Sequence, residues 1–173
     1  MVRKEKPCFC RTVEELPIEY QRVMTTCQGY LELGMPAEAL REIKALPETV
    51  ATQPVVLEMH VVVLIRAERW KAALRMARLL CREQPSQPAG FIHTAFCQHA
   101  LGDTVGARET LLKGPHTLQR EGTYFYNLAC YDAVLGNLDS ARQYLARSIR
   151  LDKRFREFAR KDRDLAALHA ELK

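Results

Sequence analysis

Histidine and cysteine side chains are the groups in this 173-residue sequence best suited to binding a metal. His93 and Cys97 are four residues apart, so on a helix they would share one face, where imidazole and thiolate can bind zinc. Cys8 and Cys10 form a second short pair. Neither pair has the repeated C-x-x-C spacing of a strong zinc site, and cysteine in an apolar stretch usually packs as a small hydrophobe. We therefore predict no metal ion and no cofactor.

Acidic residues offer little more for catalysis. Asp162 and Asp164 form a D-x-D pair, which would need a cleft and one raised pKa to hydrolyse a substrate. Their position between two expected terminal helices is instead typical of helix-capping acids. The motifs HExxH, GxSxG and GxxxxGK[ST] are all absent from the sequence. The sequence therefore predicts a protein that is not an enzyme.

Composition indicates an ordinary globular chain. Hydrophobic residues make up 47% and charged residues 27%, and 26 Lys and Arg against 21 Asp and Glu give a net charge of +5. The longest unbroken apolar run, Val61 to Ile65, is far too short to span a membrane, and no secretory signal opens the sequence. We expect a cytoplasmic protein that does not contact membranes, with its six cysteines reduced.

A repeat of fixed period contains His93 and Cys97. Four alanines recur every 34 residues, at Ala39, Ala73, Ala107 and Ala141. The turn residues before them recur with the same period, at Gly34, Glu68, Gly102 and Gly136. Apolar residues on either side of each turn follow helical spacing, and a small residue lets two paired helices approach closely. The pattern predicts four pairs of helices, each folded back through a tight turn.

This 34-residue helix-turn-helix unit resembles the tetratricopeptide repeat (TPR) family. The resemblance is clearest in TYFYNLACYDAVLGNLDSARQYLARSIRLD, from Thr123 to Asp152. It implies an all-α, right-handed superhelical solenoid with repeats at 20–53, 54–87, 88–121 and 122–155. Solenoid ends must be covered, so residues 1–19 are expected to form a basic arm with a short capping turn, and 156–173 a capping helix or helices.

In the TPR family the first helices of the repeats form a concave wall that binds protein partners. Placing the inward positions of the family on this sequence gives a mostly apolar groove: Met24, Gln28, Leu31, Glu58, Val62, Ile65, Arg66, Ile92, Phe96, His99, Tyr126 and Cys130. The Lys, Asn and Arg set with which some family members hold a peptide carboxylate is missing. The resemblance therefore implies a non-catalytic scaffold or adaptor that binds an amphipathic helix or an extended segment.

The first helix of the second repeat gives an independent argument for a covered groove. Residues 55–65 are apolar almost all round, a pattern typical of a helix that is buried on every side. Its inner side can be covered by the amino-terminal arm with Phe9, by the carboxy-terminal helix, by a partner, or by a second copy of the chain.

The sequence leaves two alternatives to a protein-binding function. Basic residues gather in 1–11 and 147–164, so Arg154, Arg156, Arg160 and Arg163 could bind nucleic acid or an acidic partner. Interleaved acidic residues and the lack of an aromatic platform make nucleic acid the weaker choice. The other alternative is a redox or metal sensor that uses the cysteines.

Overall fold

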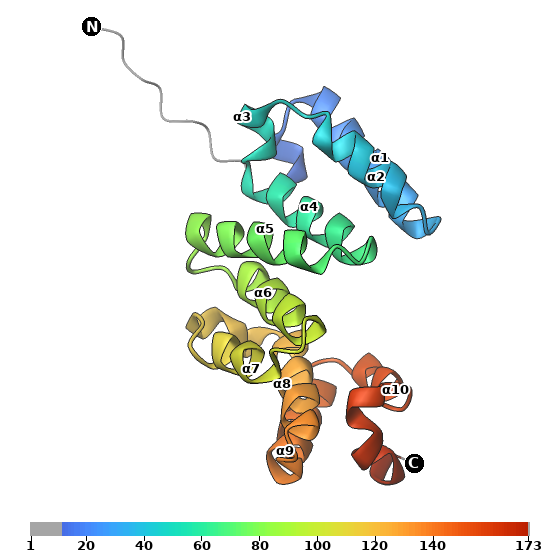
Figure 1. The fold of residues 1–173 in the computed structure, drawn as a ribbon, viewed down its shortest axis with the longest axis vertical. Helices are drawn as coiled ribbons and strands as arrows, with labels where there is room; N and C mark the ends of the chain where they lie inside the picture. Colours follow the sequence, from blue (N-terminus) through green and yellow to red (C-terminus); the bar gives the residue numbers. More distant parts are fainter. Residues whose placement is uncertain (1–11, 173) are drawn as a thin grey trace, which may run out of the picture. The chain divides into compact units, whose positions relative to one another are not determined.

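The computed structural model describes residues 12–172 (Figure 1). Regular structure in this range is entirely helical, which confirms the predicted all-α class. The chain divides into two compact units, Met1–Met76 and Ala77–Lys173. None of the helices within residues 12–172 combines the length and the apolar character that a membrane span requires.

The first unit is built from two antiparallel helices and the helix that packs against both of them. Its elements are η1 (Val13–Glu15), α1 (Ile18–Glu32), α2 (Pro36–Lys44), α3 (Glu48–Ala51), α4 (Pro54–Arg66) and the first half of α5 (Trp70–Glu83). Helices α1 and α2 form the pair, and α4 contacts both. The fully buried side chains of this unit include Ile43, Leu57 and Val61.

The second unit contains two further helix pairs and a terminal segment that packs on the last pair. Its elements are the second half of α5, α6 (Pro88–Ala100), α7 (Thr104–Leu112), η2 (His116–Arg120), α8 (Gly122–Val134), α9 (Leu138–Leu151), α10 (Arg154–Ala159) and η3 (Arg163–Leu172). Helix α8 lies at the centre of this unit, because α6, α7, α9, η2 and η3 all contact it. We call residues 154–172, which comprise α10 and η3, the C-terminal segment (Figure 1).

The repeated turns share one backbone geometry. Gly34, Gly102 and Gly136 have positive φ angles of 71°, 89° and 83°. In the second repeat Glu68 takes the same place at φ 55°, in the left-handed region that glycine adopts without a steric penalty. The residue after each turn donates its N–H to a carbonyl five positions earlier, as in Arg69 to Leu64 at 2.9 Å. All four repeated alanines, which follow these turns, have no exposed surface.

Glu68→Gly is expected to stabilise the first unit. A side chain in the left-handed region costs about 1–2 kcal/mol, and the added chain entropy of glycine offsets part of the gain, so we expect about 0.5–1 kcal/mol. Chemical denaturation followed by circular dichroism measures the change. Gly102→Ala is the matched reverse substitution, because a Cβ at that position meets no neighbouring atom. It should destabilise through backbone strain alone, and an unchanged or lower stability in Glu68→Gly would contradict the explanation.

Candidate binding surfaces

In the first unit, the predicted groove residues separate into buried and accessible groups. Met24 and Leu31 on α1 are only 2% and 5% exposed, so they form core and offer almost no surface to a partner. Gln28 is exposed and donates a hydrogen bond to Glu32 at 3.0 Å. The accessible residues are those we call the first-unit wall: Gln28 from α1, and Glu58, Val62, Ile65 and Arg66 from α4.

Helix α4 gives the first-unit wall its apolar centre and an unpaired acid. Val62 and Ile65 are half-buried, and Arg66 donates to the backbone carbonyl of Leu31 at 3.3 Å, which ties α4 to the end of α1. Glu58 is also half-buried, and no hydrogen bond or ion pair of its carboxylate is seen within residues 12–172. Burial raises the pKa of Glu58, because the charged form loses hydration without a compensating partner. The wall therefore combines the apolar side chains of Val62 and Ile65 with one poorly compensated negative charge.

In the second unit, the C-terminal segment lies against three predicted groove residues. Tyr126 donates its hydroxyl to Asp162 at 2.7 Å, and the thiol of Cys130 points to the same carboxylate oxygen at 3.6 Å. His99 Nε2 lies 2.9 Å from Asp164 Oδ2. The C-terminal segment therefore contacts these three predicted groove residues. Such contacts are what we expect if the carboxy-terminal helix, rather than a partner, covers the inner side of the helices. The amino-terminal arm with Phe9 lies outside the described residues.

Two more predicted groove residues of α6 remain at the surface or at its edge. Phe96 is 39% exposed, whereas Ile92 is half-buried and packs against the core around α8. Cys130 is 5% exposed, so its thiol faces the C-terminal segment rather than solvent. Phe96 is therefore the one predicted groove residue of α6 and α8 that is exposed.

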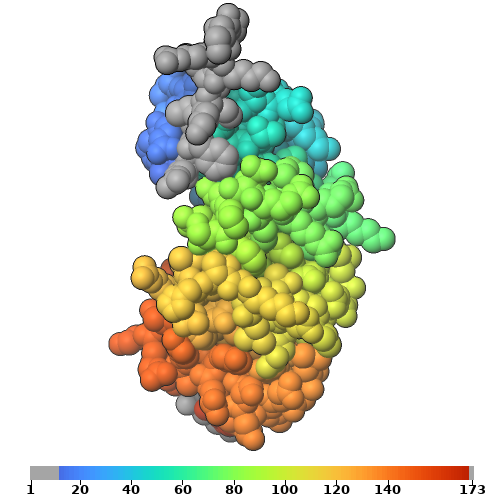
Figure 2. All heavy atoms as spheres, turned by 90° about the vertical axis from the view of Figure 1, so that its left-hand side faces the viewer, coloured from blue at the N-terminus to red at the C-terminus, as the bar shows by residue number. Residues whose placement is uncertain are grey.

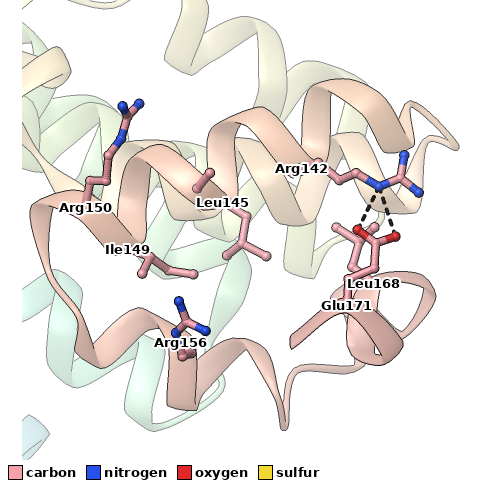
Figure 3. A pocket seen from close by; sticks show the side chains of 8 residues that line it. Arg142, Leu145, Ile149, Arg150, Arg156, Leu168 and Glu171 are labelled. Atoms are coloured by element: carbon pink, nitrogen blue, oxygen red, sulfur yellow. Dashed lines mark hydrogen bonds and ion pairs between the residues drawn. The ribbon is translucent and has the colours of Figure 1, made fainter. Parts of the chain in front are cut away.

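Apolar packing holds the C-terminal segment in place. Leu165 and Leu168 are 0% and 1% exposed and belong to the same core as α8 and α9. Figure 3 shows a pocket lined by Leu145 and Ile149 of α9 and by Arg156 and Leu168 of the C-terminal segment. An Arg142–Glu171 ion pair of 2.9 Å lies at one end of it. From the side shown in Figure 2 the segment is largely hidden behind α7 and α9.

Asp162 and Asp164 do more than the helix capping predicted from the sequence. Asp162 Oδ1 does accept the Asp164 N–H at 3.0 Å, as a turn-forming aspartate would. Its other oxygen and the Asp164 carboxylate bind side chains of α6 and α8. Sequence reasoning missed this role, because the D-x-D spacing was its only signal and the partners lie 36 and 65 residues away.

An ion pair with a fully buried carboxylate fixes α7 to α8. Asp132 on α8 has no exposed surface, and its Oδ1 accepts from Arg108 Nε at 2.6 Å and from Asn137 at 3.3 Å. Its Oδ2 is buried without a hydrogen-bond partner within the described residues. The carboxylate holds Arg108 in its charged form and raises the pKa of that guanidinium. The pair is a structural link in the last two repeats.

The cysteines have the properties of core residues. Cys27, Cys97 and Cys130 are buried, and Cys81 is half-buried. Burial raises the pKa of Cys27 and of Cys97 to about 11, so both remain protonated thiols at neutral pH. Burial also lowers the pKa of His93 to about 4. Cys8 and Cys10 lie outside the described residues.

Part of the basic cluster is already paired. Arg154 binds Asp152 at 2.7 Å, and Arg160 binds Glu157 at 2.6 Å. Arg147 lies over the ring of Phe125, 4.1 Å from its centre. These contacts lower the positive charge that the cluster offers to nucleic acid, while Arg156 and Arg163 have no such acidic partner among the contacts seen in residues 12–172.

Comparison with known proteins supports the fold. No protein-family model matches the sequence, and no curated protein matches it. Among solved structures, MamA (41-end) from Desulfovibrio magneticus RS-1 has a TM-score of 0.66 at 15% identity, over 90% of this chain and 92% of that one. PcrH in complex with the chaperone binding region of PopB has a TM-score of 0.52 at 21% identity, over 74% and 95%. Both are TPR-like helical proteins.

The chain has a TPR-like fold. A double mutant of MamA RS-1, named ArsTM, aligns in the same way, with a TM-score of 0.66 and 16% identity over 90% of this chain and 93% of that one. At these identities the likeness concerns the fold alone. The resemblance read from the 34-residue period is confirmed at that level, and membership of a particular family is not shown.

Proposed function

We propose that this protein is a non-catalytic scaffold or adaptor that binds a peptide segment of another protein on the first-unit wall. The observation that carries the proposal is Glu58, a half-buried carboxylate without a partner within residues 12–172, set between apolar neighbours on α4. Keeping such a charge costs stability, and a bound cation would recover that cost. PcrH, which shares the fold, was solved with a segment of PopB bound to it.

The chemistry of the first-unit wall defines the class of partner. Val62 and Ile65 offer apolar surface, so the segment should carry apolar residues on one face. A lysine or arginine within that face would pair with the Glu58 carboxylate. Gln28 and Arg66, at the edge of the wall, can fix the register of the bound segment. The partner we infer is therefore a protein with an amphipathic helix or an extended segment that presents a basic residue between apolar ones.

The second unit supports the choice of the first-unit wall. His99, Tyr126 and Cys130 already contact the C-terminal segment, and a partner would have to displace Asp162 and Asp164 to reach them. No such displacement is needed at Glu58, Val62 and Ile65, as far as residues 12–172 show. Binding to the first-unit wall is therefore the less costly arrangement.

Glu58→Gln is expected to separate stability from binding. Because the pKa of Glu58 is raised in the folded chain, its contribution to stability is fully present below the ordinary value of 4.5 and is lost as pH rises. The glutamine variant should therefore be more stable than the parent at pH 7 and equal to it in acid. Thermal unfolding at pH 7 and pH 3.5 checks this prediction.

Selection from a random peptide library against the full-length protein identifies the ligand class. We expect enrichment of apolar peptides that contain lysine or arginine. Acidic peptides, or a mass that rises with concentration in light scattering and falls to the monomer in Val62→Asp, would replace the proposal with a different partner or with self-association.

A further inference from the structure

Three metal-ligating side chains converge where the C-terminal segment meets α8. Cys130, Asp162 and Asp164 each offer one ligand atom, and these atoms all lie within 4.8 Å of one another. This is the only such group of three or more within the described residues. It is formed by tertiary packing rather than by a sequence motif, because Cys130 comes from α8 and the two aspartates from the far end of the chain.

His99 adds an imidazole to the same place. Its Nε2 lies 2.9 Å from Asp164 Oδ2, and its Nδ1 lies 2.9 Å from the hydroxyl of Thr104. Histidines that bind metals usually have their second ring nitrogen held in this way by a hydrogen-bonding group, which orients the ring. With Nδ1 engaged by Thr104, Nε2 is the nitrogen that faces Asp164.

A buried hydroxyl without a partner lies beside these groups. Tyr131 is 1% exposed, and its hydroxyl has no hydrogen-bond partner within residues 12–172. Its ring lies 4.9 Å from that of His99, and Tyr131 directly follows Cys130 on α8. Buried polar groups are nearly always satisfied, so an orphan here points to a group missing from the site.

We propose that Cys130, Asp162, Asp164 and His99 form a zinc site that ties the C-terminal segment to the second unit. Thiolate, imidazole and carboxylate together suit Zn²⁺, whereas Mg²⁺ and Ca²⁺ take oxygen ligands. On binding, the Cys130 S–H bond breaks, a zinc–sulfur bond forms, and the proton leaves to solvent with no change of oxidation state. The zinc site shares no residue with the first-unit wall, so a test of zinc binding is independent of a test of the proposed function.

Titration of metal-free, full-length protein with Zn²⁺ tests the proposal. We expect one zinc per chain, release of about one proton in calorimetry with buffers of different ionisation enthalpy, and a thiolate-to-metal absorption band with Co²⁺. Asp164→Asn and Cys130→Ser should each weaken binding at least tenfold. Circular dichroism verifies folding of both variants, and Asp164→Asn keeps the test valid if Cys130→Ser does not fold, because Asp164 is more exposed.

Two controls exclude other thiols. Cys81→Ser makes the same chemical change at a half-buried thiol that is bonded to Thr94, and should leave zinc binding unchanged. A Cys8→Ser, Cys10→Ser double variant should also retain it. The proposal is overturned if the parent binds no zinc at micromolar concentration, or if binding is lost in the double variant but persists in Cys130→Ser or Asp164→Asn.

Discussion

Leu165→Ala is expected to lower the free energy of unfolding of the second unit by about 2–5 kcal/mol. The side chain has no exposed surface and belongs to the core around α8, so its removal leaves a cavity in a packed interior. The C-terminal segment would then detach more readily, and backbone amides of α8 and of the segment should exchange faster in hydrogen–deuterium exchange.

Leu112→Ala is the matched control for this variant. It makes the same substitution in the same unit at a side chain that is 43% exposed. We expect a change within about 0.5 kcal/mol, as for most surface positions. Equal losses in the two variants would show that the C-terminal segment contributes nothing specific to the core.

Arg108→Ala is expected to destabilise the second unit by about 3–5 kcal/mol. The substitution removes the cation from a carboxylate that has no exposed surface, and leaves Asp132 with Asn137 as its remaining side-chain partner within residues 12–172. Chemical denaturation measures the loss. Asp132→Asn in the Arg108→Ala background should recover part of it, because the amide removes the unpaired buried charge.

The Arg142–Glu171 pair provides the control for the Arg108–Asp132 pair. Both of its side chains are more than 40% exposed, so Arg142→Ala should cost no more than about 1 kcal/mol. A cost for Arg108→Ala as small as that of Arg142→Ala would mean that water reaches Asp132 and compensates its charge.

Much of the fold was predictable from the sequence, because its signals are local. A turn that needs positive φ favours glycine, and closely packed helix pairs favour alanine. Residues such as Gly102 and Ala107 therefore indicate the repeat without any tertiary information. Glu68 shows the limit of that reasoning, since its spacing placed it at a turn but its identity gave no sign of a left-handed backbone. The short elements α3 and η2 were not predicted either. Pro47 and Pro115, which follow the ends of α2 and α7, give the physical reason for those breaks.

The candidate sites depended on contacts that local patterns do not encode. His99 and Asp164 are 65 residues apart, and their proximity follows from packing of the C-terminal segment on α8. The same packing explains why Tyr126 and Cys130, placed in a groove by resemblance, contact the chain itself. The sequence also did not indicate which of the predicted groove residues are exposed to solvent. Met24 and Val62 were assigned similar inward positions, but only Val62 retains accessible surface.

The dissociation constant of a selected peptide, compared between the parent and Glu58→Gln, tests the central claim most directly. We predict at least tenfold weaker binding in Glu58→Gln at pH 7, in a variant at least as stable as the parent. Glu38→Gln, which changes a half-buried α2 carboxylate that is paired with Arg41, should bind like the parent. Equal affinity of Glu58→Gln and the parent would contradict a binding role for the first-unit wall.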